Sequence, residues 1–311
     1  MRFPLDVAAL AALLVATLVA PVRGAVPDLA REGRWAEQVA PQVVVGDVVW
    51  LSTKLRPRVL ALYTKPPGPA KGAVIVVHGQ GVNPDWEVIG VIRTALADRG
   101  FATLSVQMPV LAADAPAEGY ADLDGEAGAR LSAALAWLHE HGYAKVAVVS
   151  HSRGAAMVDA WLAHPAAGGG APAIAAWVPM GMPVPFSTLP RMPVLDVVAA
   201  SDLPAVAATD PARIAKLPRD GCSRAVTVPM TDHFYAGAET RLVDVIAPCL
   251  AEVFDGRCAA ARQRLGQSRS SSMPAVARIS RSRTAVHARS AGTCSIRIAS
   301  APAASSRRRF A

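Results

Sequence analysis

The stretch from Lys145 to Met157, KVAVVSHSRGAAM, constrains the fold of this chain most strongly. Val146 to Ser150 are apolar or small and mostly β-branched, as in a strand buried inside a parallel sheet. A tight turn with Ser152 at its tip follows, and Ala155 to Leu162 has the composition of a helix. This order of strand, turn and helix predicts a nucleophile elbow, the turn that exposes a reactive serine. The alternative is an ordinary strand-to-helix turn in which the serine only caps the helix.

Apolar strand patterns alternate with helical patterns along the chain. The predicted strands are residues 43–51, 58–64, 73–77, 102–107, 146–150, 173–178, 194–200 and 224–228. The predicted helices are residues 29–39, 88–99, 122–141, 155–162, 210–217 and 239–254. The first two strands are expected to form an antiparallel hairpin. The alternation predicts the α/β class, with a doubly wound, mostly parallel sheet and helices on both faces. Ligands bind such sheets at the carboxyl ends of the strands.

Residues 1–24 are predicted to be a signal peptide. Arg2 precedes an apolar stretch from Val7 to Ala20, and Val22 and Gly24 are small enough for the cleavage-site positions. The apolar stretch is too short to span a bilayer comfortably, so we expect no stable membrane anchor. We therefore expect the mature protein to be periplasmic or secreted.

Residues 25–257 are expected to form a single domain and residues 258–311 a disordered tail rich in arginine, serine and alanine. Twelve of the 32 Lys and Arg residues lie after residue 256, and no acid follows Asp255. Residues 1–256 therefore hold 20 basic and 24 acidic residues, so the formal net charge of +8 arises from the tail. We expect no nucleic-acid partner for the domain. The tail could bind anionic surfaces or be a solvated appendage without function.

The four cysteines are Cys222, Cys249, Cys258 and Cys294. No pair has C-x-x-C spacing, which argues against a zinc or redox site. An exported protein meets an oxidising compartment, so a disulfide and unpaired thiols both remain open.

A serine nucleophile needs a base to take its proton. The candidate histidines of the predicted domain are His78, His139, His141, His151, His164 and His233. His233 lies in the loop between the last predicted strand and the last helix, where a base would meet the carboxyl ends of the strands. His151 is part of the turn itself, where its side chain is expected to point away from that of Ser152. We therefore expect His233 to be the base.

The base in turn needs an acid that fixes its tautomer and stabilises the imidazolium. Asp202 follows the predicted strand 194–200 and is the expected acid. Asp196 lies in the middle of that strand, and Asp232 adjoins His233 and would point the other way. The predicted catalytic residues are therefore Ser152, Asp202 and His233.

The oxyanion that forms during acyl transfer needs backbone N–H donors. The N–H group of Arg153 directly follows the nucleophile. The second donor is expected from His78-Gly79-Gln80-Gly81, the loop after the predicted strand 73–77. Gln80 is the expected donor, and Gly81 is the alternative.

From Leu51 to Phe254 the chain resembles the α/β-hydrolase superfamily. The order Ser152, Asp202, His233 is the order of that superfamily. The segments HGQGVNPDWEVIG, ALADRGFATLSVQMPVL and VPMTDHFY resemble more narrowly an uncharacterised bacterial α/β-hydrolase-like family. This sequence departs from the superfamily pattern at Ser150, where a glycine is usual, and at Arg153, where a smaller or apolar residue is common.

The resemblance implies hydrolysis of an ester, thioester or amide without a metal or organic cofactor. The expected function is that of a serine hydrolase acting on a small carboxylic ester through an acyl-enzyme. The expected partner is a small acyl substrate, and the sequence indicates neither its identity nor the oligomeric state. The alternative is a non-catalytic binding protein on the same scaffold, because fold does not fix function.

Overall fold

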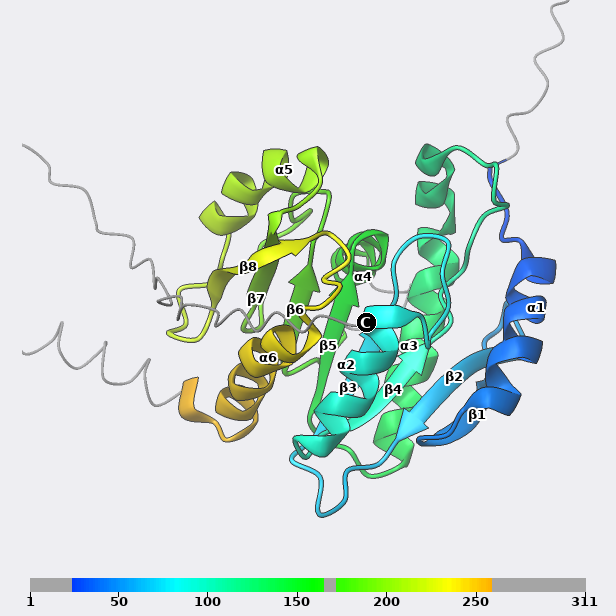
Figure 1. The fold of residues 1–311 in the computed structure, drawn as a ribbon, viewed down its shortest axis with the longest axis horizontal. Helices are drawn as coiled ribbons and strands as arrows, with labels where there is room; N and C mark the ends of the chain where they lie inside the picture. Colours follow the sequence, from blue (N-terminus) through cyan, green and yellow to red (C-terminus); the bar gives the residue numbers. More distant parts are fainter. Residues whose placement is uncertain (1–23, 165–171, 259–311) are drawn as a thin grey trace, which may run out of the picture.

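The computed structural model describes residues 24–164 and 172–258, which form one sheet flanked by helices (Figure 1). The strands are β1 (Asp47–Leu51), β2 (Val59–Thr64), β3 (Ala73–Val77), β4 (Ala102–Val106), β5 (Val146–His151), β6 (Ala176–Met180), β7 (Leu195–Ser201) and β8 (Arg224–Asp232). The α-helices are α1 (Leu29–Val39), α2 (Glu87–Asp98), α3 (Asp124–Glu140), α4 (Arg153–Ala163), α5 (Pro204–Ala215) and α6 (Glu239–Phe254). Two 3₁₀ helices are η3 (Ala40–Gln42) and η4 (Ala117–Leu123).

The eight strands form a single sheet in the order β1-β2-β4-β3-β5-β6-β7-β8. The β1–β2 pair is antiparallel, as expected for the opening hairpin, and the β2–β4 pair is antiparallel as well. The pairs from β4 through β3, β5, β6 and β7 to β8 are parallel. The predicted class is confirmed: the sheet is doubly wound and mostly parallel, with helices on both faces.

The sequence placed most elements within a few residues of their observed bounds. The clearest difference is α5, which was expected at residues 210–217 and begins at Pro204. Proline suits the first turn of a helix because its missing N–H would have no partner there. β8 also runs past residue 228 to Asp232, and so brings its end next to His233.

The residues of the central strands alternate between two apolar cores. In β3, Val74 and Val76 pack into the core beneath α2 and α6. Ile75 and Val77 face the opposite core, which α3 and α4 cover. Figure 1 shows α2 and α6 in front of the sheet and α3 and α4 behind it. Burial on both faces explains why the central strands are continuous apolar runs.

A buried arginine attaches α1 to the rest of the domain. The guanidinium of Arg130 on α3 is fully buried and forms ion pairs with Glu32 of α1, at 2.8 Å, and with Glu126. It also donates to the carbonyl oxygen of Gln107, just after β4, at 3.0 Å. Because an unpaired buried charge is costly, these partners fix α1 beside the carboxyl end of β4.

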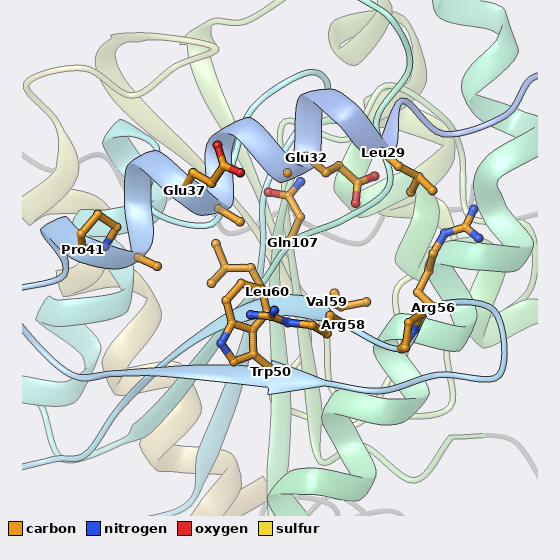
Figure 2. A pocket seen from close by; sticks show the side chains of 14 residues that line it. Leu29, Glu32, Glu37, Pro41, Trp50, Arg56, Arg58, Val59, Leu60 and Gln107 are labelled. Carbon is orange, nitrogen blue, oxygen red and sulfur yellow. The ribbon is translucent and has the colours of Figure 1, made fainter.

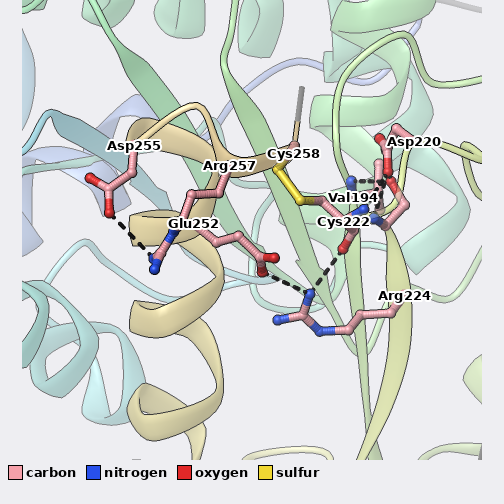
Figure 3. Close-up of a disulfide and its surroundings, with 9 residues drawn as sticks. Val194, Asp220, Cys222, Arg224, Glu252, Asp255, Arg257 and Cys258 are labelled. Carbon is pink, nitrogen blue, oxygen red and sulfur yellow. Dashed lines mark hydrogen bonds and ion pairs between the residues drawn. A yellow bond between two sulfur atoms is a disulfide. The ribbon is translucent and has the colours of Figure 1, made fainter. Parts of the chain in front are cut away.

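A disulfide connects the end of the last helix to the start of the last strand. Cys258, which follows α6, bonds to Cys222, which precedes β8 (Figure 3). Cys249 on α6 is a buried free thiol. The question left open by the sequence is therefore answered for these three cysteines, whereas Cys294 lies outside the described residues.

The predicted signal peptide and tail lie outside the described residues, apart from Gly24 and Cys258 at their borders. Both remain predictions from the sequence. In the part of the chain that the structure describes, no helix is both long and apolar enough to cross a membrane.

Candidate active site

The turn between β5 and α4 has the backbone of a nucleophile elbow. Ser152 has φ 54° and ψ −127°, which non-glycine residues rarely adopt and which costs about 1–3 kcal/mol. Gly154 follows where α4 passes the loop after β3. A Cβ atom on Gly154 would lie 2.1 Å from the carbonyl oxygen of His78, so only glycine fits there. The observed turn exposes Ser152 at the carboxyl edge of the sheet.

Ser150 replaces the first glycine of the usual elbow pattern without leaving a buried polar group unpaired. Its side chain is fully buried in β5, and its hydroxyl oxygen accepts a hydrogen bond from Trp177 Nε1 at 2.9 Å. Because Trp177 lies on the neighbouring strand β6, the serine links two central strands directly below the elbow. A buried hydroxyl that has a partner avoids the cost of desolvation.

The structure brings Ser152, His233 and Asp202 together in a continuous hydrogen-bonded chain. His233 Nδ1 lies 2.6 Å from Asp202 Oδ1, and His233 Nε2 lies 2.8 Å from Ser152 Oγ. A carboxylate only accepts hydrogen bonds, so Nδ1 carries the proton and Nε2 accepts from the serine hydroxyl. This is the tautomer that a general base needs in order to take a proton from serine.

Asp202 is held as a carboxylate by its hydrogen bonds. Burial alone would raise the pKa of this carboxyl, but the hydrogen bonds from His233 and from the N–H groups of Ala199 and Leu203 lower it below its ordinary value. Oδ2 accepts from the Ala199 N–H at 2.9 Å, and Oδ1 accepts from the Leu203 N–H at 2.8 Å. The carboxylate is therefore charged and fixed in position beside the imidazole.

Asp196, the competing acid in the sequence, has a different partner. It is fully buried in β7 and lies 2.9 Å from Nε of Arg213 on α5, which is also fully buried. Burial raises the pKa of Asp196 to about 6, although Arg213 opposes the shift. Asp196 thus belongs to a structural ion pair.

The two expected oxyanion donors are free to bind a ligand. Within the described residues, the N–H groups of Gln80 and Arg153 donate no hydrogen bond to a protein acceptor. Arg153 is also the first residue of α4, so its N–H lies at the positive end of the helix dipole. Gly79 brings the loop against the elbow: a Cβ atom there would lie 3.2 Å from Ser152 Cβ.

A buried histidine shapes the loop after β3. His78 is fully buried, and burial lowers its pKa to about 4, so the ring is neutral. Its Nδ1 donates to the carbonyl oxygen of Gly79 at 2.8 Å. Its Nε2 accepts from the Met108 N–H at 2.8 Å and lies 3.1 Å from the amide nitrogen of Gln107. The loop is therefore tied to the end of β4.

Sequence reasoning missed Arg31 of α1, which holds the same loop from the other side. Its guanidinium donates to the carbonyl oxygens of Gly81 and Leu111, both at 3.0 Å. Gly81 has a φ of 71°, in the left-handed region that favours glycine. No local sequence pattern predicts this contact, because Arg31 and Gly81 are 50 residues apart in the chain.

Sequence reasoning also missed two residues that support His233. His151 is buried, and its Nε2 donates to the carbonyl oxygen of His233 at 2.9 Å. Gly181, just after β6, leaves room for the imidazole, because a Cβ atom there would lie 2.9 Å from His233 Cε1 and Nδ1. The sequence did carry a signal for Gly181, because it is a glycine directly after a strand of the parallel sheet.

A cavity of about 540 Å³ lies away from Ser152, between α1 and the β1–β2 hairpin (Figure 2). Its inner wall includes Gln107, but none of Ser152, Asp202 and His233 lines it. Across residues 24–164 and 172–258, no three His, Cys, Asp or Glu side chains are grouped as a metal site. The hydrogen bonds that join Ser152, His233 and Asp202 make this group the candidate active site.

Several solved structures that match this arrangement of strands and helices are described as hydrolases or hydrolase homologues. An α/β serine hydrolase homologue from Coxiella burnetii has 16% identity and a TM-score of 0.52, covering 66% of this chain and 98% of its own. The chain has the α/β-hydrolase fold.

Further neighbours have the same fold at similarly low identity. A dienelactone hydrolase from Anabaena variabilis has 22% identity and a TM-score of 0.50, covering 65% of this chain and 94% of its own. Est1E from Butyrivibrio proteoclasticus has 14% identity and a TM-score of 0.51, covering 67% of this chain and 99% of its own.

The sequence comparisons say less about this chain than the structural comparisons do. Residues 19–127 match a family described as a protein of unknown function, DUF3530. The match is about a third of the chain and ends before the elbow, so it includes Gln80 but not Ser152, Asp202 or His233. No curated protein matches the chain in sequence.

We predict that His151 makes stability depend on pH. Burial first, and the nearby His233 second, lower the pKa of His151 to about 4. Between about pH 4 and 6.5 the unfolded chain binds a proton at this residue and the folded chain does not. Stability that is fully present above this range is therefore lost as the pH falls through it.

The substitution His151→Gln removes this titration and keeps a side-chain N–H that can reach the carbonyl oxygen of His233. The slope of unfolding free energy against pH, measured with urea between about pH 4.5 and 6, should fall by about 1 kcal/mol per pH unit. Equal slopes for the two proteins would contradict a neutral, buried His151.

Proposed function

We propose that this protein is a serine hydrolase that cleaves a small carboxylic ester through an acyl-enzyme intermediate. The observation that carries the proposal is the chain of hydrogen bonds from Ser152 through His233 to Asp202. The hydrolases among the structural neighbours support it at the level of the fold. The strained backbone of Ser152 adds support, because strain that exposes a hydroxyl has a role in catalysis and none in packing.

The acylation step follows from the positions of these groups. His233 Nε2 removes the hydroxyl proton as Ser152 Oγ attacks the carbonyl carbon of the ester. The N–H groups of Gln80 and Arg153 bind the oxyanion, and the N-terminus of α4 favours its negative charge. Asp202 stabilises the imidazolium. The imidazolium then passes its proton to the oxygen of the leaving alcohol, whose bond to the carbonyl carbon breaks.

Deacylation uses the same groups in reverse. A water molecule takes the place of the departed alcohol, and His233 Nε2 accepts a proton from it as its oxygen attacks the acyl carbon. The second oxyanion collapses, the bond to Ser152 Oγ breaks, and Oγ recovers a proton from His233. The products are a carboxylic acid and an alcohol, and the protein returns to its starting state.

Ser152→Ala should abolish turnover of 4-nitrophenyl esters without unfolding the protein.

Asp202→Asn should lower kcat by several orders of magnitude, about 10⁴-fold in the best-studied triad, because the variant lacks the carboxylate that fixes the tautomer of His233. The measurement is turnover over a panel of acyl lengths, with folding checked by circular dichroism. If the folded wild-type protein shows no turnover, the result would instead favour the alternative, a non-catalytic binding protein on the same scaffold.

Two other aspartates provide controls for Asp202. Asp232→Asn keeps an oxygen that can accept the Phe234 N–H, as Asp232 Oδ1 does at 3.0 Å, and should leave kcat within about twofold. Asp196→Asn breaks a buried ion pair, so it should cost about 3–5 kcal/mol of stability and little kcat in the protein that remains folded. If a folded Asp196→Asn protein is inactive while Asp202→Asn is active, the acid is wrongly assigned.

We further propose that the mature protein works outside the cytoplasm. The apolar stretch from Val7 to Ala20 supports export, and so does the disulfide between Cys222 and Cys258, which persists in oxidising compartments. Mass spectrometry of the protein from its native host should find a mature chain that begins near Ala25 or Val26. A cytoplasmic protein that retains Met1 would contradict the proposal.

A further inference from the structure

Two aromatic side chains meet beside the candidate catalytic centre. Trp86 ends the loop that carries Gln80 and directly precedes α2, and Phe234 directly follows His233. The two ring centroids are 6.0 Å apart, with the rings edge to face at 73°. The centroid of the Phe234 ring also lies 5.5 Å from the centroid of the His233 ring. The pair therefore connects the loop of the oxyanion donor to the loop of the base.

The two rings differ in exposure. Trp86 is partly buried and packs against the core beneath α2 and α6, so it is anchored. Phe234 is 47% exposed, although its neighbour His233 is buried. A single exposed apolar side chain needs no explanation, but this one lies in contact with the group that transfers protons. Leu203, which follows Asp202, is 44% exposed and adds a second apolar side chain next to a member of the triad.

The direction of proton transfer decides which part of a substrate meets these rings. During acylation, the proton on His233 Nε2 goes to the oxygen of the leaving alcohol, so that oxygen must lie within hydrogen-bonding reach of Nε2. The rest of the alcohol then extends on the His233 side, where Phe234 lies. The acyl chain lies on the other side of the scissile bond.

The charges next to the pair limit the kind of alcohol. Asp232 is exposed and its carboxylate accepts the Phe234 N–H, while Glu87 directly follows Trp86 and is also exposed. The Asp232 carboxylate at the backbone of Phe234 disfavours an alcohol that carries a negative charge, because like charges repel and such a group would lose its hydration.

The geometry points to Trp86 and Phe234 as the subsite for the leaving group, and to esters of uncharged apolar alcohols, aromatic ones above all, as the substrate class. This inference rests on the proposed serine hydrolase. A contact between aromatic rings adds to the gain from burying apolar area, so a preference of about tenfold or more is expected.

The test compares two esters that differ only in the alcohol, 2-phenylethyl butanoate and ethyl butanoate. Both release primary alcohols from the same acyl group, so their ratio of kcat/KM reports the leaving-group subsite. The variants are Phe234→Ala and the control Leu55→Ala, because Leu55 is 53% exposed in the turn between β1 and β2, away from the triad. Turnover of 4-nitrophenyl acetate reports separately whether the triad works.

The wild-type protein and Leu55→Ala should prefer the 2-phenylethyl ester by about tenfold or more, and Phe234→Ala should lose most of that preference. If Phe234→Ala merely disturbed His233, both esters would slow equally and the ratio would not change. A wild-type protein that turns over 4-nitrophenyl acetate without the preference, or a preference that survives in Phe234→Ala, overturns this inference alone. No turnover of any ester overturns the proposed function and the inference with it.

Discussion

The candidate site depends on how closely α4 approaches the loop after β3. Gly154 lets the first turn of α4 lie against the carbonyl oxygen of His78, where a Cβ atom would be 2.1 Å away. Arg153 is the first residue of α4, and Gly79, next to Gln80, lies against Ser152, where a Cβ atom on the glycine would be 3.2 Å from Ser152 Cβ. At the same place, the positive φ of Ser152 turns the chain sharply from β5 into α4. One backbone contact thus brings the loop of Gln80, an expected oxyanion donor, against the turn that carries Ser152, the candidate nucleophile.

Buried and half-buried polar groups hold that contact. Neutral His78 ties the loop after β3 to the end of β4, and Arg31 ties it to α1. The ion pairs of Arg130 with Glu32 and Glu126 keep α1 in place. A buried ion pair contributes little net stability, but losing one of its partners is costly. These groups therefore favour one geometry of the loop over others.

The sequence predicted the fold and the residues that meet at the site for a simple reason. In a parallel sheet, residues that follow different strands meet at one edge, so Ser152, Asp202 and His233 could be selected by their positions after predicted strands. The same rule separated Asp202 from Asp196, because Asp196 lies within β7 and pairs with Arg213.

Most of the features that the sequence did not predict are contacts between residues that lie far apart in the chain. Arg31 reaches Gly81, and Arg130 reaches Glu32, across 50 and 98 residues without any local pattern. The disulfide closes a separation of 36 residues, which spacing alone could not distinguish from the other pairings. The start of α5 at Pro204 was missed because apolar periodicity gave no sign of it.

In the proposed mechanism, His233 activates Ser152 as the nucleophile. The most direct measurement is peptide mass spectrometry after treatment of the folded protein with a fluorophosphonate, which phosphonylates activated serines. If His233 activates Ser152, one adduct forms on Ser152, and the reaction is much slower in a folded His233→Ala protein. No adduct on Ser152, or equal labelling rates in the wild type and the variant, would contradict it.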